Sequence, residues 1–416
     1  MIETLKNAWR IPELRKKLLF VVFALVIFRF GYAIYVPYVD TESLAEIFQQ
    51  YSNTLLGYFN TLSGGGFSQA SIFALSVYPY INSSIIMQLL QVAIPALERM
   101  VKDGGEEGRK KLASITRYVT IALSLLMGWT YYIMLRSSGV LLRTDAWSAI
   151  VIIMTFTAGS AFIMWLGEQI NSKGVGNGIS IILFASIVSR GPAAIMTIIN
   201  GMRSGSMNVI SLIIILVVSV LMIGFIVFIT NAERRLPIQY AKRMVGRKLY
   251  GGQSTYLPMK VNMSGVMPII FASSIVSFPG TLIQFLNPKE GTFWYNFGQA
   301  FNQGSVAYIV VYALLIIGFA YFYATIQFNP TEIANNLKRN GGFIPGFRPG
   351  RPTAEFLSKV LSRLTFFGAI YLGIVAILPI IAENISGIVN ISIGGTSVII
   401  VVGVALETVK MIEAQM

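Results

Sequence analysis

The chain contains no cysteine and no histidine among its 416 residues. The absence of cysteine excludes disulfide bonds and thiol nucleophiles. The absence of histidine excludes imidazole bases and the commonest zinc ligands. Charged residues are also scarce, at 12% of the composition. These absences remove much of enzyme chemistry, and we expect neither a catalytic activity nor a bound metal or cofactor.

Apolar residues dominate what is present. Hydrophobic residues make up 55% of the chain and the mean hydropathy is +0.67, far outside the range of soluble globular proteins. Runs of about 20 apolar residues, the length that crosses a bilayer as a helix, recur along the whole sequence. We therefore expect an all-α polytopic membrane protein with ten transmembrane helices. The runs lie within residues 18–37, 74–95, 114–135, 147–167, 179–199, 208–230, 264–286, 305–328, 365–382 and 394–412.

The basic residues are distributed unevenly between the two sides of these ten runs. The formal net charge is +14, and 26 of the 32 Lys and Arg residues lie on one side if the N-terminus is cytoplasmic. This asymmetry follows the positive-inside rule. It predicts a multi-pass protein of the cell membrane with both termini in the cytoplasm.

Ten spans divide into five plus five near residue 205, and an odd number per half inverts one half relative to the other. We therefore expect two pseudosymmetric inverted halves, residues 1–205 and 206–416. Val77 to Ile81 and Val266 to Ile270 both read V-x-P-x-I, at equivalent places in the second and seventh spans. This short match supports an inverted repeat.

Two predicted cytoplasmic loops are long and basic. Residues 231–262 carry seven basic residues, with Gly251-Gly252 predicting a hairpin tip. Residues 329–363 place Arg348 between glycine and proline turns. Basic loops are ordinary features of membrane topology. The length of these two loops and their rigid proline and glycine turns favour a docking surface that projects from the membrane. Its ligand would be a large polyanionic or acidic partner.

The stretch "LSGGGFSQASIFALSVYPYINSSIIMQLL", residues 62–90, interrupts a span with Gly64 to Gly66 and Pro79. Non-helical backbone at membrane depth is tolerated only inside protein or along a water-filled cavity. A half-helix over residues 67–75, hinged at the glycines, would be too short to span and would act as a stopper. A re-entrant loop without a mobile role is the alternative, and broken helices also mark the binding sites of carriers.

Three functions remain open on these grounds: a channel, a small-solute secondary transporter with inverted repeats, and a scaffold for membrane assembly. Ion-coupled carriers keep ionisable groups near the bilayer midplane. Here Arg29 in the first span is the exception, because the only aspartates are predicted to lie in loops, at Asp40, Asp103 and Asp145. The sequence therefore ranks the carrier below the channel.

Several long motifs resemble the SecY family, the channel subunits of the Sec protein-translocation machinery. They include "SGGGFSQASIFALSVYPYINSSIIMQLLQ", "MWLGEQINSKGVGNGISI", "QSTYLPMKVNMSGVMPIIFASSI", "NPTEIANNLKRNGGFIPGFRPG" and "RLTFFGAIYL", in the family's order. The resemblance implies an hourglass channel. It would pass unfolded secretory polypeptides across the membrane and release hydrophobic segments sideways into lipid.

The resemblance also implies three groups of residues in the membrane. The plug would be Ser63, Gly64, Gly65, Gly66, Phe67, Ser68, Gln69, Ala70, Ser71, Ile72 and Phe73. The pore ring would be Val77, Ile81, Ile179, Leu183, Ile270 and Ile400. The lateral gate, between the second and seventh spans, would carry Asn82 and Ser274. An apolar constriction excludes water and ions yet closes around any peptide.

The two basic loops resemble the family's docking site for the SecA motor ATPase and the ribosome. By motif, Arg243, Arg247, Lys248 and Arg348 would contact these partners. The resemblance further implies the small subunits SecE and SecG as partners, besides signal sequences, translocating polypeptides and membrane lipid. Since the sequence holds no nucleotide-binding motif, the bound motor or ribosome would supply the energy.

Overall fold

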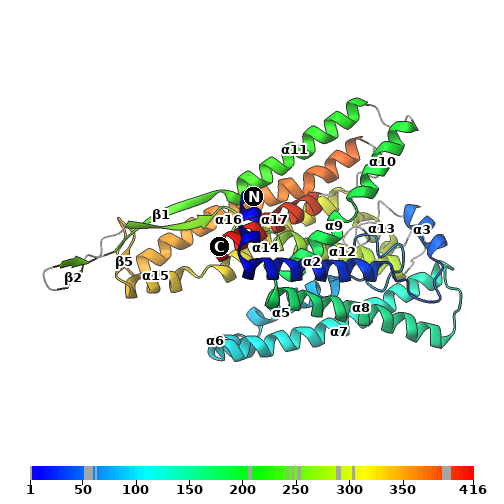
Figure 1. Cartoon of the computed structure of the whole chain (residues 1–416), viewed down its shortest axis with the longest axis horizontal. Coiled ribbons are helices and arrows are strands. Elements are labelled where there is room, and N and C mark those ends of the chain that lie inside the picture. Colours follow the sequence, from blue (N-terminus) through cyan, green and yellow to red (C-terminus); the bar gives the residue numbers. More distant parts are fainter. Residues whose placement is uncertain are drawn as a thin grey trace.

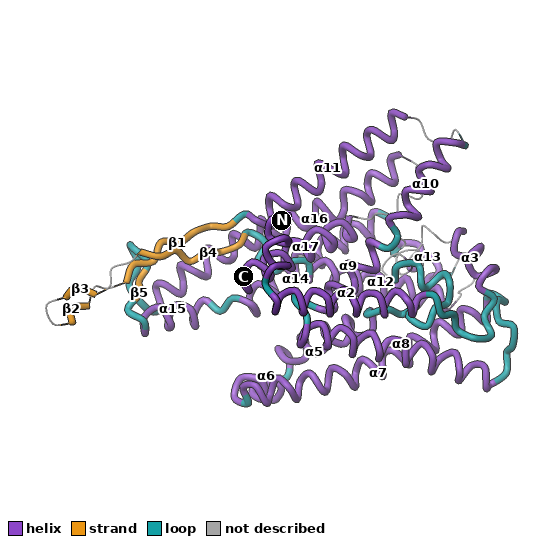
Figure 2. Tube along the Cα trace, viewed as in Figure 1, coloured by secondary structure: helices purple, strands orange, loops and turns teal. Residues whose placement is uncertain are grey.

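The structure of the chain is a computed structural model. It describes residues 2–50, 60, 63–204, 209–240, 243–245, 248–250, 254–286, 292–301, 305–386 and 395–416. Helices dominate it, and strands are confined to one projecting region (Figure 2).

Each of the ten apolar runs is occupied by one helix or by two consecutive helices. They are α2 (Pro12–Tyr32), α5 (Tyr78–Ala93), α7 (Gly105–Ser137), α8 (Ala146–Lys173), α9 (Gly178–Val188) with α10 (Gly191–Arg203), α11 (Val209–Asn231), α12 (Met267–Leu286), α14 (Val306–Gln327), α16 (Arg351–Ser386) and α17 (Gly395–Gln415). Within the described residues, five helices are long and apolar enough to cross a membrane. The pair α5 and α6 (Pro95–Asp103), bent by 97°, makes a sixth if it is one span.

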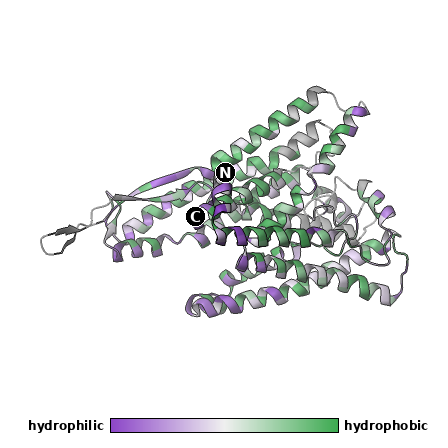
Figure 3. Ribbon diagram, viewed as in Figure 1, coloured by the Kyte–Doolittle hydropathy of each residue, from purple (hydrophilic) through white to green (hydrophobic). Residues whose placement is uncertain are grey.

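The bundle has two distinct ends (Figure 1). Both termini, α1 (Ile2–Arg10), α6 and α15 (Pro330–Arg339) lie at or beyond one end, and α3 (Thr41–Gln50) and α13 (Phe293–Ala300) lie toward the other. The segments predicted to be cytoplasmic therefore gather at one end. Hydrophobic residues predominate on the helices between the ends, whereas α6 and β1 are richer in hydrophilic residues (Figure 3).

The two long basic loops form one structure rather than two. Strand β1 (Glu233–Tyr240) pairs antiparallel with β4 (Ser254–Lys260) and, at its far end, with the short β5 (Gly342–Phe343) of the other loop. A separate hairpin of β2 (Arg243–Val245) and β3 (Lys248–Tyr250) extends furthest from the bundle (Figure 1). The predicted tip at Gly251-Gly252 lies outside the described residues.

This projecting region, which we call the arm, has its own hydrophobic core. Leu236 of β1, Met259 of β4 and Leu357 of α16 are at most 4% exposed and belong to one cluster. Leu361 and Ala324 extend that cluster toward the membrane bundle. The arm is thus packed onto the end of α14 and the first part of α16, and the two loops cannot move independently without opening this core.

The plug segment is a chain of turns, so the expected half-helix over residues 67–75 is wrong. Residues 63–77 are turns with a single bridge at Ser71. Positive φ angles of 44° at Ala70 and 50° at Ser76 take the backbone out of the right-handed helical region. A regular helix begins only at Tyr78, with Pro79 in its first turn. Pro79 therefore marks the start of a helix, because the first turn of a helix tolerates proline.

The V-x-P-x-I motif lies at the start of a helix in both places. Helix α5 begins at Tyr78 and α12 at Met267, each directly after the valine of the motif. Proline is therefore the second residue of each helix, where its missing N–H removes no intrahelical hydrogen bond. The match fixes where two contacting helices start.

We predict that Leu357→Ala opens the arm. Deleting a fully buried leucine side chain costs about 2–5 kcal/mol, since the cavity closes only partly. Hydrogen exchange of the β1 and β4 amides should accelerate by at least about tenfold, while the membrane helices keep their protection. Tyr256→Ala, at a side chain 62% exposed on β4, is the matched control and should leave exchange unchanged. Equal exchange in both variants would contradict a shared arm core.

Candidate functional site: a plugged apolar constriction

The backbone of the plug segment is tied to the chain that follows α2. The Val36 amide donates to the Ala70 carbonyl at 2.9 Å, and the Ile72 amide donates to the Ile34 carbonyl at 3.0 Å. Tyr35 and Ser71 form the bridge between these two bonds. The turns therefore satisfy backbone groups that a regular helix would have satisfied internally, as burial in a membrane protein requires.

Phe67 anchors the plug in an aromatic pocket. Its ring stacks on Tyr131 of α7 with centroids 4.1 Å apart, and meets Phe48 of α3 edge-on at 5.6 Å. The Tyr131 hydroxyl donates a hydrogen bond to the Phe67 carbonyl. Tyr131 is only 2% exposed, so this bond is shielded from water. One side chain of α7 therefore holds both the ring and the backbone of Phe67.

Two glycines on neighbouring helices make room for the plug. A Cβ added to Gly159 of α8 would lie 1.9 Å from the Ile72 carbonyl oxygen. A Cβ added to Gly31 of α2 would lie 1.9 Å from the ring of Phe73. Both separations are far below van der Waals contact. The position of the Ile72 backbone therefore requires glycine at residue 159, whereas a Cβ at residue 31 would displace the ring of Phe73.

The six residues predicted for the pore ring lie in a single hydrophobic cluster. Five are at most 8% exposed, and Ile270 is partly buried against them. Val77 directly precedes α5, and the other five lie on four helices, α5, α9, α12 and α17. Phe73 of the plug belongs to the same cluster, and Ile72 packs against it. The plug segment is thus seated on these aliphatic side chains, while their role as a pore ring stays a prediction.

The seam between α5 and α12 carries the two predicted gate residues. The helices contact each other, and Asn82 and Ser274 are both half-buried. No hydrogen bond joins these two described side chains, and the Ser274 hydroxyl is buried without a hydrogen-bond partner. The seam is therefore not locked by a polar pair in this state, and the gating role of both residues stays a prediction.

The predicted docking residues lie on the arm as far as the structure describes them. Arg348 is exposed on the turn between β5 and α16, flanked by Gly346 and Gly350 with φ of 89° and 102°. The Thr353 hydroxyl donates to the Arg348 carbonyl at 2.8 Å and steadies the turn. Arg243 opens β2 and Lys248 opens β3. Arg247 lies outside the described residues, and the docking role of all four stays a prediction.

Comparison with known proteins decides the family. The SecY family model matches residues 71–409. The protein translocase subunit SecY of Streptomyces coelicolor is 42% identical over 100% of this chain and 98% of its own length. That of Thermotoga maritima is 42% identical over 100% of this chain and 96% of its own length. The chain belongs to the SecY family.

Solved structures share the SecY-family fold. One reported as the structure of a protein conducting channel covers 99% of this chain and 96% of its own, with a TM-score of 0.68 at 16% identity. Sec61 in a canine ribosome-channel complex gives a TM-score of 0.64 at 15% identity, with the same coverage. The expected all-α polytopic fold and the resemblance to SecY are confirmed, and the small-solute carrier is not favoured.

Sequence reasoning missed the residues that receive the plug. Tyr131 was one of many aromatics in an apolar run, and nothing local shows that it faces Phe67, 64 positions away. Gly159 carried a weak signal, since an isolated glycine inside a helix marks a close approach of another segment. The SecY-family resemblance implied which segment would act as a plug, but not which residues contact that segment.

We predict that Gly159→Ala displaces the plug, because the new methyl group would collide with the backbone of Ile72. Single-channel recordings in planar bilayers should show more frequent openings than the unmodified protein. Gly318→Ala on α14 is the matched control, since a Cβ there meets no atom within 4 Å. In a background lacking residues 65–72, Gly159→Ala should add no further openings. Added openings there would place its effect outside the plug.

Tyr131→Phe should loosen the plug without removing the stacked ring. Loss of the hydroxyl leaves the Phe67 carbonyl without this donor, at a cost of about 1 kcal/mol, or roughly fivefold in the unseated population. Because the chain lacks cysteine, a thiol introduced by Ser68→Cys reports unseating through its labelling rate. Tyr118→Phe, at a residue 74% exposed on the same helix, should leave that rate unchanged. Equal labelling rates in the two variants would contradict the role of the Tyr131 hydroxyl in holding Phe67.

Proposed function

We propose that this chain is a protein-conducting channel sealed by residues 63–73 as plug and by the six-residue aliphatic ring. It passes unfolded secretory polypeptides across the membrane. The observation that carries the proposal is the seated plug, since Phe73 packs in the same cluster as Val77 and Ile81. An apolar ring resists water and ions when empty, and its side chains close around any peptide without recognising sequence.

Sideways release of hydrophobic segments follows from the seam between α5 and α12. The absence of a hydrogen bond between Asn82 and Ser274 leaves apolar packing to hold it. Interhelical contacts within membranes are worth about 1 kcal/mol each, so a hydrophobic signal segment can replace them. The buried Ser274 hydroxyl would then gain access to a partner as the seam opens.

The arm supports docking of a large partner that supplies energy. Arg348 is presented on a rigid turn, and arginine's planar fork suits phosphate and carboxylate groups. The ribosome and the SecA motor ATPase are the partners implied by the family, with SecE and SecG as accessory subunits. The chain itself would perform no catalysis. It would lie in the plasma membrane with the arm and both termini in the cytoplasm, as the positive-inside distribution supports.

A division into two halves, 1–205 and 206–416, completes the proposal. The central cluster draws Ala24 and Ile81 from the first half and Phe271 and Ile400 from the second. The pore would therefore lie at the interface of the halves, as expected for an assembly of inverted repeats.

Single-channel current across a planar bilayer tests the sealed pore. The unmodified protein should be tight, and deletion of residues 65–72 should give frequent, flickering openings, because the ring alone then holds the seal. Translocation assays with SecA and a secretory polypeptide would follow. If the deletion variant folds correctly but shows no more channel openings than the unmodified protein, the plug assignment is wrong.

A further inference from the structure

Helix α3 lies toward the end of the bundle away from the arm and has two different faces (Figure 1). Leu44 is fully buried and Phe48 is 5% exposed, and both belong to one hydrophobic cluster with Tyr131 of α7. Glu42 and Glu46 are exposed on the other face of the helix. The helix therefore packs its apolar face against the bundle and turns its acidic face outward.

The start of α3 is fixed by hydrogen bonds. The Asp40 carboxylate accepts from the Glu42 amide at 3.1 Å and from the Ser43 hydroxyl at 2.6 Å, which caps the first turn. The Asp40 amide donates to the Val140 carbonyl at 2.9 Å, in the connection between α7 and α8. Beyond this turn, apolar side chains pack the helix against the cluster. A rotation about the capped turn would separate apolar surfaces without breaking these hydrogen bonds.

The ring of Phe67 in the plug segment contacts aromatic rings from two different helices. Tyr131 stacks on it at 4.1 Å, and Phe48 meets it edge-on at 5.6 Å with 85° between the rings. Ala70 of the plug segment belongs to the same cluster as Phe48. Tyr131 is part of a long membrane helix, whereas Phe48 lies on a short helix at the end of the bundle. The contact with Phe48 can therefore open without disturbing a membrane helix.

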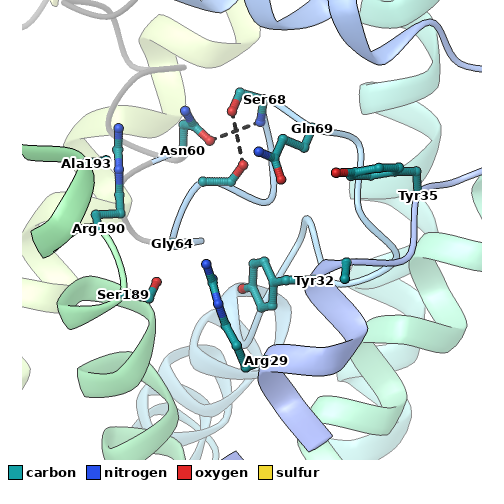
Figure 4. A pocket seen from close by; sticks show the side chains of 12 residues that line it. Arg29, Tyr32, Tyr35, Asn60, Gly64, Ser68, Gln69, Ser189, Arg190 and Ala193 are labelled. Carbon is teal, nitrogen blue, oxygen red and sulfur yellow. Dashed lines mark hydrogen bonds between the residues drawn. The ribbon is translucent and has the colours of Figure 1, made fainter. Parts of the chain in front are cut away.

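Another part of the plug segment borders open space. A cavity of about 420 Å³ is lined by Gly64, Gly65, Ser68 and Gln69 of this segment, by α2, and by the junction between α9 and α10 (Figure 4). The Asn60 side-chain oxygen accepts from the Ser68 amide at 3.0 Å at the edge of this space. A displaced segment has room on this side, so its retention depends on the contacts of Phe67.

We propose that α3 is an outer lid over the plug and that Phe48 is a positioning residue, which holds the ring of Phe67 in its pocket. The lid closes by packing Leu44 and Phe48 on the cluster, and it opens by rotating about the capped turn at Asp40. The plug then has two restraints, the Tyr131 hydroxyl from within the bundle and the Phe48 ring from outside. This role rests on the proposed function of residues 63–73 as plug, and two separate thiols distinguish a failure of the lid from a failure of the plug.

Phe48→Leu tests the positioning role by channel openings in planar bilayers. It keeps an apolar side chain in the cluster but removes the edge-to-face pair, so openings should become about two- to tenfold more frequent. Glu46→Gln, exposed on the same helix, is the matched control and should leave openings unchanged. In a background lacking residues 65–72, Phe48→Leu should have no effect. No increase over the control, or an equal increase in the deletion background, would contradict the role of Phe48.

Thiol labelling follows the lid and the plug separately, because the chain has no cysteine of its own. Leu44→Cys reports on the lid and Ser71→Cys on the plug, since both side chains are fully buried. Ser43→Cys, exposed on α3, is the matched control. SecA drives a secretory polypeptide into the channel until a folded domain at its end arrests it. A membrane-impermeant maleimide is then added on the side of α3, and each labelling rate is compared with the rate without polypeptide.

The arrested polypeptide should accelerate labelling of Leu44→Cys and Ser71→Cys together, by at least about tenfold, and leave Ser43→Cys unchanged. Faster labelling of Ser71→Cys alone means that the plug moves without the lid, and faster labelling of Leu44→Cys alone means that α3 opens independently of the plug. Either result overturns the lid and leaves the channel intact. If both thiols stay protected while the polypeptide is arrested, residues 63–73 are not the plug, and the proposed plug falls together with the lid.

Discussion

The structure depends on one constraint: backbone polar groups buried at membrane depth must find partners inside the protein. The plug breaks the helical ladder, and its hydrogen bonds go instead to Ile34 and Val36, to Tyr131 and to Asn60. These partners lie on different elements. The proposed unseating would therefore break several bonds together, and a seated and an unseated state would be distinct rather than continuous.

The proposed seal would combine two kinds of interaction, apolar packing and directional hydrogen bonds. The aliphatic cluster around Ile81 and Leu183 is non-directional, so it accommodates a displaced plug or a passing chain with little specificity. The bonds at Phe67 and Ser68 are directional, few, and worth about 1 kcal/mol each. Sealing thus relies on apolar packing, whereas position relies on a small number of polar contacts. A channel that must open repeatedly needs this division, because a wholly apolar stopper would have no defined seat.

Local sequence patterns predicted the features that depend on neighbouring residues alone. Apolar runs indicated the helices, and the V-x-P-x-I match indicated that the second and seventh spans share a local feature, which is the start of α5 and of α12. The half-helix was wrong because apolar character over residues 67–75 does not report the left-handed backbone at Ala70. The β1–β5 pairing of Gln239 with Phe343 joins residues about a hundred positions apart, and no local pattern encodes such a partner.

Helix α16 carries the arm into the membrane without a linker. Near its start Leu357 lies in the arm core, and further along Leu372 and Val375 lie in a membrane cluster with Ile399 of α17. The next residue of α17, Ile400, belongs to the proposed ring. A partner bound to the arm therefore meets a continuous packed route to the constriction. Transmission along that route needs α16 to have two arrangements that the partner distinguishes, since a ligand with equal affinity for both shifts neither.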